Sequence, residues 1–395
     1  MRSLIESIQQ RPLPYRTPQP KFLAELARLP IHSILNAGAA ADEARCRAAM
    51  EESPLSLEGA ASLLVGRSAP SLPEILERAR SVTDRTFGRT ILLYAPCYLS
   101  SYCVNHCRYC RFNFTMQFER RFLQPQAAEG EVKLLGLQGM RKILLVAGDF
   151  PSKVTPEYVE EVIEKARSIA GEIDLEVAPT ITRIYRSWAS SGAGGVTCYQ
   201  ETYDGAAYSL VHPRGPKSSY VFRLGTLERA GAGGMKRLGL GVLLGLAEPY
   251  SDILALIAHA RFLGRFFPRA RISVSLPRLC PAVPSYSGPY AIDLDTLLRF
   301  YAVLRMALPS ADLVGSTREL PEVRKRLLEA GITQMSAGSV TVPGGYGEKK
   351  REGGQFDTSD HRCVAEVVED LEGLGYLVRW TGEARPVTHH EGERN

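Results

Sequence analysis

The sequence predicts an α/β protein folded as a (β/α)8 barrel of the TIM type, with a layer of helices ahead of the barrel. Two observations support this prediction. Short runs rich in Val, Ile and Leu recur along the chain, and helix-like stretches follow them. Strands of a parallel sheet are buried on both faces, so they read as continuous apolar runs. Eight such runs alternating with helices favour the closed barrel over a doubly wound open sheet.

The predicted strands are apolar runs bounded by glycine, proline or charged residues, which interrupt regular structure. The first begins at Thr90, so the whole predicted barrel lies downstream of that point. The eight runs span residues 90–99, 142–150, 174–180, 195–201, 238–246, 271–278, 311–319 and 333–339.

Helical patterns lie between and after these runs. In 157–171, the apolar residues Val159, Val162 and Ile163 share one side, and a glycine ends the pattern. Similar patterns span 251–266, 294–308, 321–331 and 363–376. Ahead of the first strand, helices are predicted at 23–30, 57–65 and 72–88.

These patterns divide the chain into three regions. Residues 1–88 form a predicted N-terminal helical region, and residues 89–380 form the barrel. The polar residues 381–395 are expected to form a disordered tail. A Gly-rich, charged loop at 344–361 is expected near the barrel top, and loops of this length are usually functional or disordered.

Composition and charge argue against two kinds of partner. The formal net charge of +5 is slight for 395 residues, and no basic cluster contains interleaved aromatics, so no nucleic-acid partner is expected. No apolar run approaches the roughly 20 residues that span a bilayer, and the first residues lack a signal-peptide core. We therefore expect no membrane partner and a cytoplasmic protein. Thiols stay reduced there, so clustered cysteines indicate metal binding or catalysis.

Three cysteines follow the first predicted strand. Cys103, Cys107 and Cys110 have the spacing C-x3-C-x2-C. Three thiolates on a tight loop can bind three irons of a [4Fe–4S] cluster. The fourth iron can then accept S-adenosylmethionine, and an electron from the cluster can break its sulfonium bond to give a 5'-deoxyadenosyl radical. A loop after a strand lies at the C-terminal mouth of a barrel, where barrel enzymes keep their active sites.

Other interpretations of the cysteines remain open. The three thiols and His106 could bind zinc, but the chain lacks a second C-x2-C hairpin, and His106 directly precedes a cysteine. A disulfide is disfavoured where thiols stay reduced. Cys97 could be a fourth ligand, although its place inside the apolar strand favours a buried structural thiol. We interpret the remaining cysteines in the same way: Cys46, Cys198, Cys280 and Cys363.

The stretch YLSSYCVNHCRYC resembles the aromatic amino-acid lyases of the radical S-adenosylmethionine (SAM) superfamily. Further motifs of this family follow in order, including LLVAGDFP, YQETYD, SVSLPRLCPA, GSTRE, SAGSVTVPGGYGE and GQFDTSDHR. The resemblance runs from about residue 70 to residue 376. It implies a full barrel that holds a [4Fe–4S] cluster and SAM. It also implies cleavage of the Cα–Cβ bond of free L-tyrosine to p-cresol and dehydroglycine (2-iminoacetate).

The resemblance implies roles for residues that contact the cofactors. Cys103, Cys107 and Cys110 are the implied cluster ligands. The backbone of Tyr109 is implied to contact the adenine, and Gly148 with Asp149 to meet the methionine amino group. Arg223 or Arg278 could bind the SAM carboxylate, although for each one taken alone a structural role is favoured.

It also implies roles for residues that contact the substrate. Arg318 in GSTRE could clamp the substrate carboxylate, and Ser339 could help to hold the carboxylate or the amine. Glu201 is expected to line the pocket with Gln200 and Tyr203. The structural alternatives are a salt bridge for Arg318, a strand-end cap for Glu201 and a backbone hydrogen bond for Ser339.

The sequence departs from the family pattern at two positions. Arg111 follows the third cysteine where the family usually has Gly, and we expect this cation to lie near the cluster. Asp149 is one methylene shorter than the usual Glu. These departures keep open a lyase for another aromatic amino acid such as tryptophan. A separate alternative, from another class of protein, is a non-catalytic iron–sulfur or zinc scaffold. The chain also lacks the second cysteine motif of the tyrosine-cleaving hydrogenase maturase, so synthesis of carbon monoxide and cyanide is not expected.

The implied chemistry requires partners. An electron donor, flavodoxin or ferredoxin, must reduce the cluster. Dehydroglycine is short-lived in water, so a product-accepting partner such as a thiazole synthase is also expected.

Overall fold

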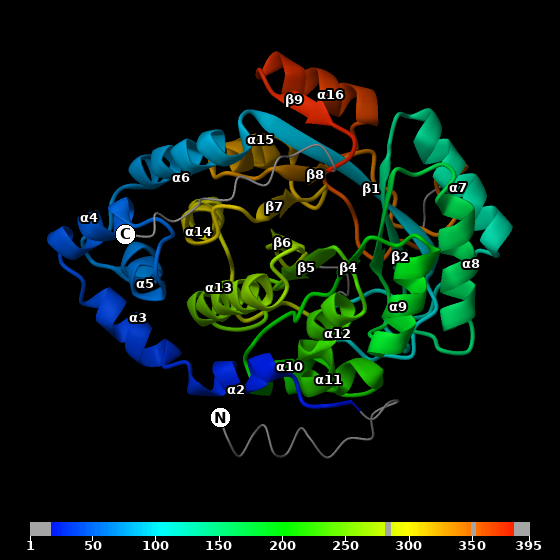
Figure 1. Ribbon diagram of the computed structural model, residues 1–395, viewed down its shortest axis with the longest axis horizontal. Helices are drawn as coiled ribbons and strands as arrows, with labels where there is room; N and C mark the ends of the chain where they lie inside the picture. Colours follow the sequence, from blue (N-terminus) through cyan, green and yellow to red (C-terminus); the bar gives the residue numbers. More distant parts are fainter. Residues whose placement is uncertain (1–16, 281–285, 349–352, 383–395) are drawn as a thin grey trace.

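A computed structural model describes residues 17–280, 286–348 and 353–382 and confirms the predicted barrel (Figure 1). Its sheet has the strand order β2-β3-β4-β5-β6-β7-β8-β1-β9, and pairing of β1 with β2 closes it. Every pairing is parallel. The first eight strands each overlap a predicted run: β1 Thr90–Ser100, β2 Lys142–Ala147, β3 Glu172–Glu176, β4 Gly195–Thr197, β5 Arg237–Gly241, β6 Arg271–Ser275, β7 Asp312–Gly315 and β8 Gln334–Ser336.

Strand β9, Leu377–Arg379, was not predicted from the sequence. It pairs with the first residues of β1, and Leu377 is exposed. An edge strand with an exposed apolar residue lacks the continuous burial that marks the other strands. Several predicted runs extend past their strands because they include residues of the loops that bend over the barrel mouth. The run 195–201, for example, continues beyond β4 to Glu201, where φ is +71°.

Helices surround the barrel. Those at α8 Pro156–Ala166, α13 Pro249–Phe266, α14 Leu294–Ala307, α15 Pro321–Glu329 and α16 Val364–Gly373 match predicted patterns. Further helices, not predicted, are α7 Pro125–Leu137, α9 Thr182–Ser191, α10 Gly205–Val211, η1 Pro216–Ser218, α11 Tyr220–Leu224 and α12 Thr226–Ala232. No helix in the described ranges is both long and apolar enough to cross a bilayer.

The N-terminal helices run along the outside of α13 and α14 (Figure 1). The three predicted helices are present, and α3 and α4 are additional: α2 Lys21–Arg28, α3 Ile31–Ala39, α4 Glu43–Glu51, α5 Leu57–Val65 and α6 Leu72–Phe87. Phe22 stacks on His259 of α13 at 4.1 Å between ring centres. Gly38 allows close helix packing, because a Cβ there would lie 2.7 Å from Ala61. This layer therefore packs tightly against one side of the barrel.

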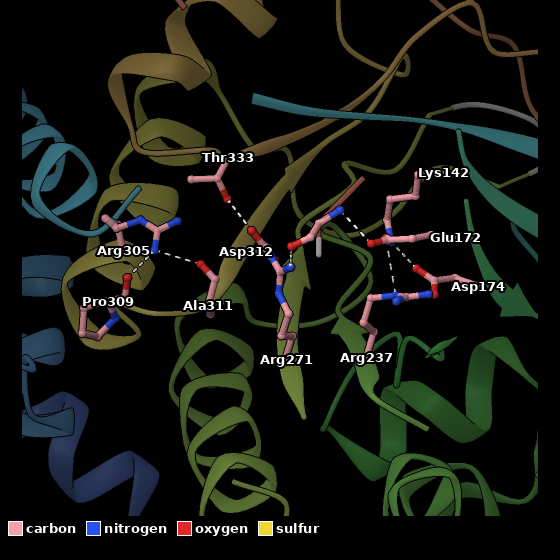
Figure 2. Close-up of polar contacts among 11 residues, drawn as sticks. Lys142, Glu172, Asp174, Arg237, Arg271, Arg305, Pro309, Ala311, Asp312 and Thr333 are labelled. Carbon is pink, nitrogen blue, oxygen red and sulfur yellow. Dashed lines mark hydrogen bonds and ion pairs between the residues drawn. The ribbon is translucent and has the colours of Figure 1, made fainter. Parts of the chain in front are cut away.

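Paired charges fill the N-terminal end of the barrel (Figure 2). They come from the first residues of several strands: Lys142, Glu172, Asp174, Arg237, Arg271 and Asp312. Gly382 closes this cluster, because its N–H donates to Glu172 at 2.7 Å and its carbonyl accepts from Arg271 at 2.6 Å. Gly382, which was expected to belong to a disordered tail, is thus held against the barrel, and residues 383–395 lie outside the described residues. With the bottom closed, the opposite end of the barrel is left for a binding site.

Candidate active site

A cavity of about 190 Å³ lies at the C-terminal ends of the strands. All eight barrel strands, or the loops that follow them, contribute to its lining. Ten of the eleven predicted site residues line it: Cys103, Cys107, Tyr109, Cys110, Gly148, Asp149, Glu201, Arg223, Arg318 and Ser339. The fold therefore brings together residues that are more than 200 positions apart in the sequence.

The cysteine loop is held in place by its own polar contacts. Val104 N–H donates to the Asp149 carbonyl at 2.8 Å, and the Asn113 amide donates to the Cys107 carbonyl at 3.0 Å. The guanidinium of Arg120 donates to four backbone carbonyls, including that of Ser101 at 2.7 Å. These bonds set the loop geometry through protein contacts alone.

The donor set fits a [4Fe–4S] cluster. Cys103 and Cys110 pack against an apolar wall formed by Tyr98, Phe112 and Val146. Burial raises the pKa of the Cys103 thiol to about 11, and binding to iron would stabilise its thiolate form. In the described part of the chain, no three His, Cys, Asp or Glu side chains gather around one point as a single metal ion requires. Cluster thiolates instead bind three separate irons.

The other residues considered as metal ligands from the sequence, His106 and Cys97, lie outside the cavity lining. The His106 ring packs on Phe114 at 5.4 Å and does not line the cavity, so the zinc site loses its fourth ligand. Cys97 is fully buried and also lies outside the cavity lining. Cys46 and Cys198 are buried as predicted. The prediction was wrong for Cys363, which is exposed ahead of α16, and Cys280 is only partly buried.

Gly148 and Asp149 follow β2 beside the cysteine loop. A Cβ at Gly148 would lie 2.3 Å from the Tyr102 carbonyl oxygen, so only glycine allows this close approach. The Asp149 carboxylate is nearly buried and accepts a hydrogen bond from the Asn105 amide at 3.0 Å. Burial raises the Asp149 pKa, and the Asn105 bond opposes this rise. A carboxylate held in this way can accept a hydrogen bond from an ammonium group.

A cationic wall lies on one side of the cavity. Glu201 pairs with Lys217 at 2.6 Å and with Arg223 at 3.4 Å. Burial alone would raise the Glu201 pKa, but the two cations outweigh it and leave that pKa below its usual value. One carboxylate thus faces two cations, which suits the binding of a further carboxylate. Lys217, in the stretch HPRGPKSSY, was not singled out from the sequence.

Tyr109 is fixed through its side chain. Its hydroxyl donates to Nε2 of His212 at 2.8 Å, and Nδ1 of His212 donates to the Tyr208 carbonyl at 2.9 Å. Burial holds the His212 pKa well below its usual value, so this imidazole is neutral. The anchored ring leaves the Tyr109 backbone positioned beside the cavity.

Two polar groups of the cavity lining have neither a hydrogen-bond nor an ion-pair partner among the described residues. The Arg318 guanidinium lies 3.5 Å from the centre of the Phe356 ring and forms no ion pair with any described residue. The Ser339 hydroxyl is buried without a hydrogen-bond partner in the same part of the chain. A buried polar atom without a partner is costly, so its presence points to a ligand.

Glu176 is a cavity residue that the sequence analysis missed. It ends β3 and lines the cavity. Burial, together with Glu201, raises its pKa to about 7, against the opposing charge of Arg318. A perturbed pKa of this kind marks candidate functional residues. The signal available in the sequence was a carboxylate, Glu176, in the interior of the apolar run 174–180, two residues after Asp174.

Comparison with known proteins gives two family matches. Residues 97–260 match the radical SAM superfamily, and residues 275–377 match the biotin and thiamin synthesis associated domain. The chain is 32% identical to 2-iminoacetate synthase of Escherichia coli K12 over 347 residues, which cover 88% of this chain and 91% of that protein. The chain belongs to this family of radical SAM enzymes. Like other members of the superfamily, the enzyme uses a [4Fe–4S] cluster and SAM.

Two crystal structures of related radical SAM enzymes share the fold. One is of HydG, a maturase of the [FeFe]-hydrogenase, with a TM-score of 0.83, 31% identity and coverage of 89% of this chain and 79% of that one. The other is HydG from Carboxydothermus hydrogenoformans, with a TM-score of 0.80, 32% identity and coverage of 97% and 85%.

Three residues expected at the radical SAM site lie elsewhere. Arg278 is held by Glu319 through two contacts, one of 2.8 Å, and faces a different surface pocket. The Tyr203 hydroxyl contacts His259 at 2.9 Å behind the barrel wall, and the Gln200 side chain is buried outside the cavity lining. A sequence does not reveal such partners, because they come from distant elements.

Arg111 does not leave an unpaired charge beside the cluster cysteines of this radical SAM enzyme. Its guanidinium forms two hydrogen bonds with the Asp357 carboxylate, at 3.0 and 2.8 Å, and a third with the Gly354 carbonyl at 3.1 Å. The expected cation is therefore neutralised locally by the loop that passes over it.

Proposed function

We propose that this enzyme cleaves the Cα–Cβ bond of free L-tyrosine to give p-cresol and dehydroglycine (2-iminoacetate). The observation that carries the proposal is the pairing of two features in one cavity. Three cluster cysteines line one part of it, and the unpartnered Arg318 and Ser339 line another. An arginine fork matches a carboxylate in a bidentate pair. Similarity to 2-iminoacetate synthase supports the same substrate.

The protein's own groups would bind and orient the two small molecules. When bound, the cluster and SAM supply the 5'-deoxyadenosyl radical that acts on the substrate amino group. Cys103, Cys107 and Cys110 would hold the cluster. Asp149 would accept a hydrogen bond from the SAM ammonium, and the cationic wall at Lys217 and Arg223 would bind its carboxylate.

On the substrate side, Arg318 would bind the carboxylate and Ser339 would donate a hydrogen bond to it. Glu176 is suited to exchange a proton with the substrate, because its pKa of about 7 is close to neutral pH. The buried walls would keep water from the reacting groups.

The proposed reaction needs two partners. Flavodoxin or ferredoxin would donate the electron that starts each turnover. A thiazole synthase, or another enzyme that consumes dehydroglycine, would take up that product before water destroys it.

The direct test is an anaerobic assay of the reconstituted enzyme with SAM, dithionite and tyrosine. We expect p-cresol and 5'-deoxyadenosine to appear in step. Deoxyadenosine without p-cresol would reject tyrosine as the substrate, and repeating the assay with tryptophan would test the alternative lyase. A protein with a full cluster that forms neither product would support the scaffold alternative.

A matched pair of variants tests the carboxylate clamp. Arg318→Lys keeps the charge but loses the fork, so the KM for tyrosine should rise at least about tenfold. Arg278→Lys makes the same exchange outside the cavity and should leave the KM for tyrosine and SAM near the wild-type values. An unchanged tyrosine KM in Arg318→Lys would remove Arg318 from the proposed site.

A further inference from the structure

A second, smaller cavity lies beside the catalytic one, bounded by α8, α9, α11 and the loops after β2 and β3. We call it the side chamber. Its volume is about 140 Å³. The residues that it does not share with the catalytic cavity are mostly apolar and include Val154, Val159, Trp188 and Phe222. An apolar cavity of about 150 Å³ can hold one benzene ring, so the side chamber has room for a single aromatic ring.

The chamber walls are held in place by their own contacts. The Trp188 indole N–H donates to the Pro156 carbonyl at 3.0 Å. The Arg229 guanidinium lies 4.1 Å from the centre of the Phe222 ring. A preformed pocket loses less free energy on binding than one that must first become ordered.

One polar group of this apolar lining has no partner. Thr180 lines the chamber and is 5% exposed. Its backbone N–H donates to the Tyr185 hydroxyl at 3.1 Å, and its carbonyl accepts from Arg229 at 2.7 Å. Its side-chain hydroxyl is buried without a hydrogen-bond partner among the described residues. Because both backbone groups are engaged, Thr180 is fixed in place, and a ligand with one hydroxyl group could remove the cost of the unpaired one.

The side chamber borders the catalytic cavity directly. The two share the loop residues 177–179 together with Asp149, Lys217 and Arg223. A molecule formed in the catalytic cavity has to pass this boundary to reach the chamber. Because Asp149, Lys217 and Arg223 are also the groups proposed to bind SAM, it can do so only after methionine has left them. The boundary carries the charged side chains of Asp149, Lys217 and Arg223, whereas the chamber behind it is apolar, so a small charged product would remain on the catalytic side.

We propose that the side chamber binds the phenol released from the substrate, with its ring among the apolar side chains and its hydroxyl hydrogen-bonded to Thr180. This role rests on the proposed tyrosine cleavage. p-Cresol is one apolar ring with a single hydroxyl, which matches both the volume and the single unpaired polar atom. The chamber would thus separate the aromatic product from dehydroglycine.

The first experiment measures equilibrium binding of p-cresol and of toluene to the reconstituted enzyme. Wild type should bind p-cresol about fivefold more tightly than toluene, the equivalent of one net hydrogen bond. Thr180→Val should remove this preference without changing toluene affinity, whereas Thr180→Ser should retain it. Equal preference in wild type and Thr180→Val, or no p-cresol binding by wild type, would overturn the assignment.

The second experiment changes the chamber volume at Val154, which is only partly buried and does not line the catalytic cavity. Val154→Phe should weaken p-cresol binding at least about tenfold, and Val154→Ala should strengthen binding of the larger 4-ethylphenol. Melting curves check that both variants fold. Wild-type p-cresol affinity in Val154→Phe would reject this location.

A single-turnover assay separates the two proposals. Val154→Phe should form 5'-deoxyadenosine and p-cresol in one turnover as wild type does, because the catalytic cavity is unchanged. If wild type cleaves tyrosine but the Thr180 and Val154 variants bind p-cresol with wild-type affinity, only the inference about the side chamber fails. If p-cresol binds as expected but tyrosine is never cleaved, the lyase proposal fails, and the product role of the chamber fails with it.

Discussion

The two ends of the barrel differ in how their buried polar groups are paired. At the bottom, Lys142 contacts Glu172 at 2.9 Å and Asp174 at 2.5 Å, and all three side chains are almost fully buried. At the top, Arg318 has no ion pair and the Ser339 hydroxyl has no hydrogen-bond partner among the described residues. Paired groups stabilise the native state, and unpaired groups are held ready for a ligand. The difference indicates that the bottom serves stability and the top serves chemistry.

A single strand carries both kinds of group. Glu172, Asp174 and Glu176 alternate along β3, so all three project from the same face. Burial alone would raise the pKa of Glu172 and of Asp174, but Lys142 and Arg237 outweigh it and keep both pKa values low. Glu176, which forms no ion pair within the described chain, has its pKa raised to about 7 by burial. The carboxylates at the start of β3 therefore form ion pairs in the barrel bottom, whereas the carboxylate at its end lines the cavity and has a raised pKa.

The largest expected effect comes from breaking the bottom cluster. Lys142→Met removes the cation shared by Glu172 and Asp174, so the free energy of unfolding should fall by about 3–5 kcal/mol, as measured by denaturant titration. Lys133→Met is the matched control, because Lys133 forms an exposed i,i+4 pair with Glu129. That variant should leave the free energy of unfolding near the wild-type value, because an exposed ion pair contributes little to stability. Similar losses in the two variants would show that the buried cluster is not structural.

The next largest effect is expected when an arginine is replaced by methionine at the top of the barrel and, separately, at the bottom. Arg318→Met should lower kcat/KM for tyrosine about 100-fold with little change in melting temperature, since no protein group loses an ion pair. Arg271→Met should do the reverse, because Arg271 pairs with Asp312 at 2.7 Å. Melting curves and the p-cresol assay on both variants measure this contrast. A large loss of stability in Arg318→Met would contradict it.

A smaller effect depends on pH. The Glu176 pKa is about 7 in the folded protein, above its unfolded value of 4.5. The folded state therefore holds a proton that the unfolded state has lost, and stability falls as pH rises from 4.5 to about 7. Glu176→Gln should remove this fall, so its melting temperature should gain on wild type across that range. Parallel melting temperatures for the two proteins would place the Glu176 pKa near its usual value.

The smallest predicted effect removes one hydrogen bond at the bottom. The Thr333 hydroxyl donates to Asp312 at 3.1 Å, so Thr333→Val should cost about 1 kcal/mol of stability without affecting p-cresol formation. Thr86→Val is the control, since the Thr86 hydroxyl bonds only its own helix backbone at Val82. Equal losses in the two variants would mean that the cluster adds nothing to the value of this bond.

The barrel strands were predictable because a strand that is buried on both faces consists of a continuous run of apolar residues. Helices such as α9 were missed because polar residues dominate the segment Thr182–Ser191. The three candidate cysteine ligands and Arg318, which line the cavity, were singled out through local motifs whose interpretation does not depend on distant residues. The raised pKa of Glu176 and the ion pair of Lys217 depend on groups far away in sequence, so a local motif could not predict them. For the same reason the sequence did not predict that Arg278 pairs with Glu319 instead of lining the cavity.

Strand β1 joins the beginning of the barrel to its end. Its later residues pair with β2, which follows it in the chain, but its earlier residues pair with β8 and β9, more than 230 positions downstream. The cysteine loop extends directly from this seam. Contacts between such distant segments form late in folding, because closing a long loop has a high entropic cost. Because the cysteine loop is anchored to this seam, we expect iron and sulfide to be inserted after β1 has paired with β8 and β9.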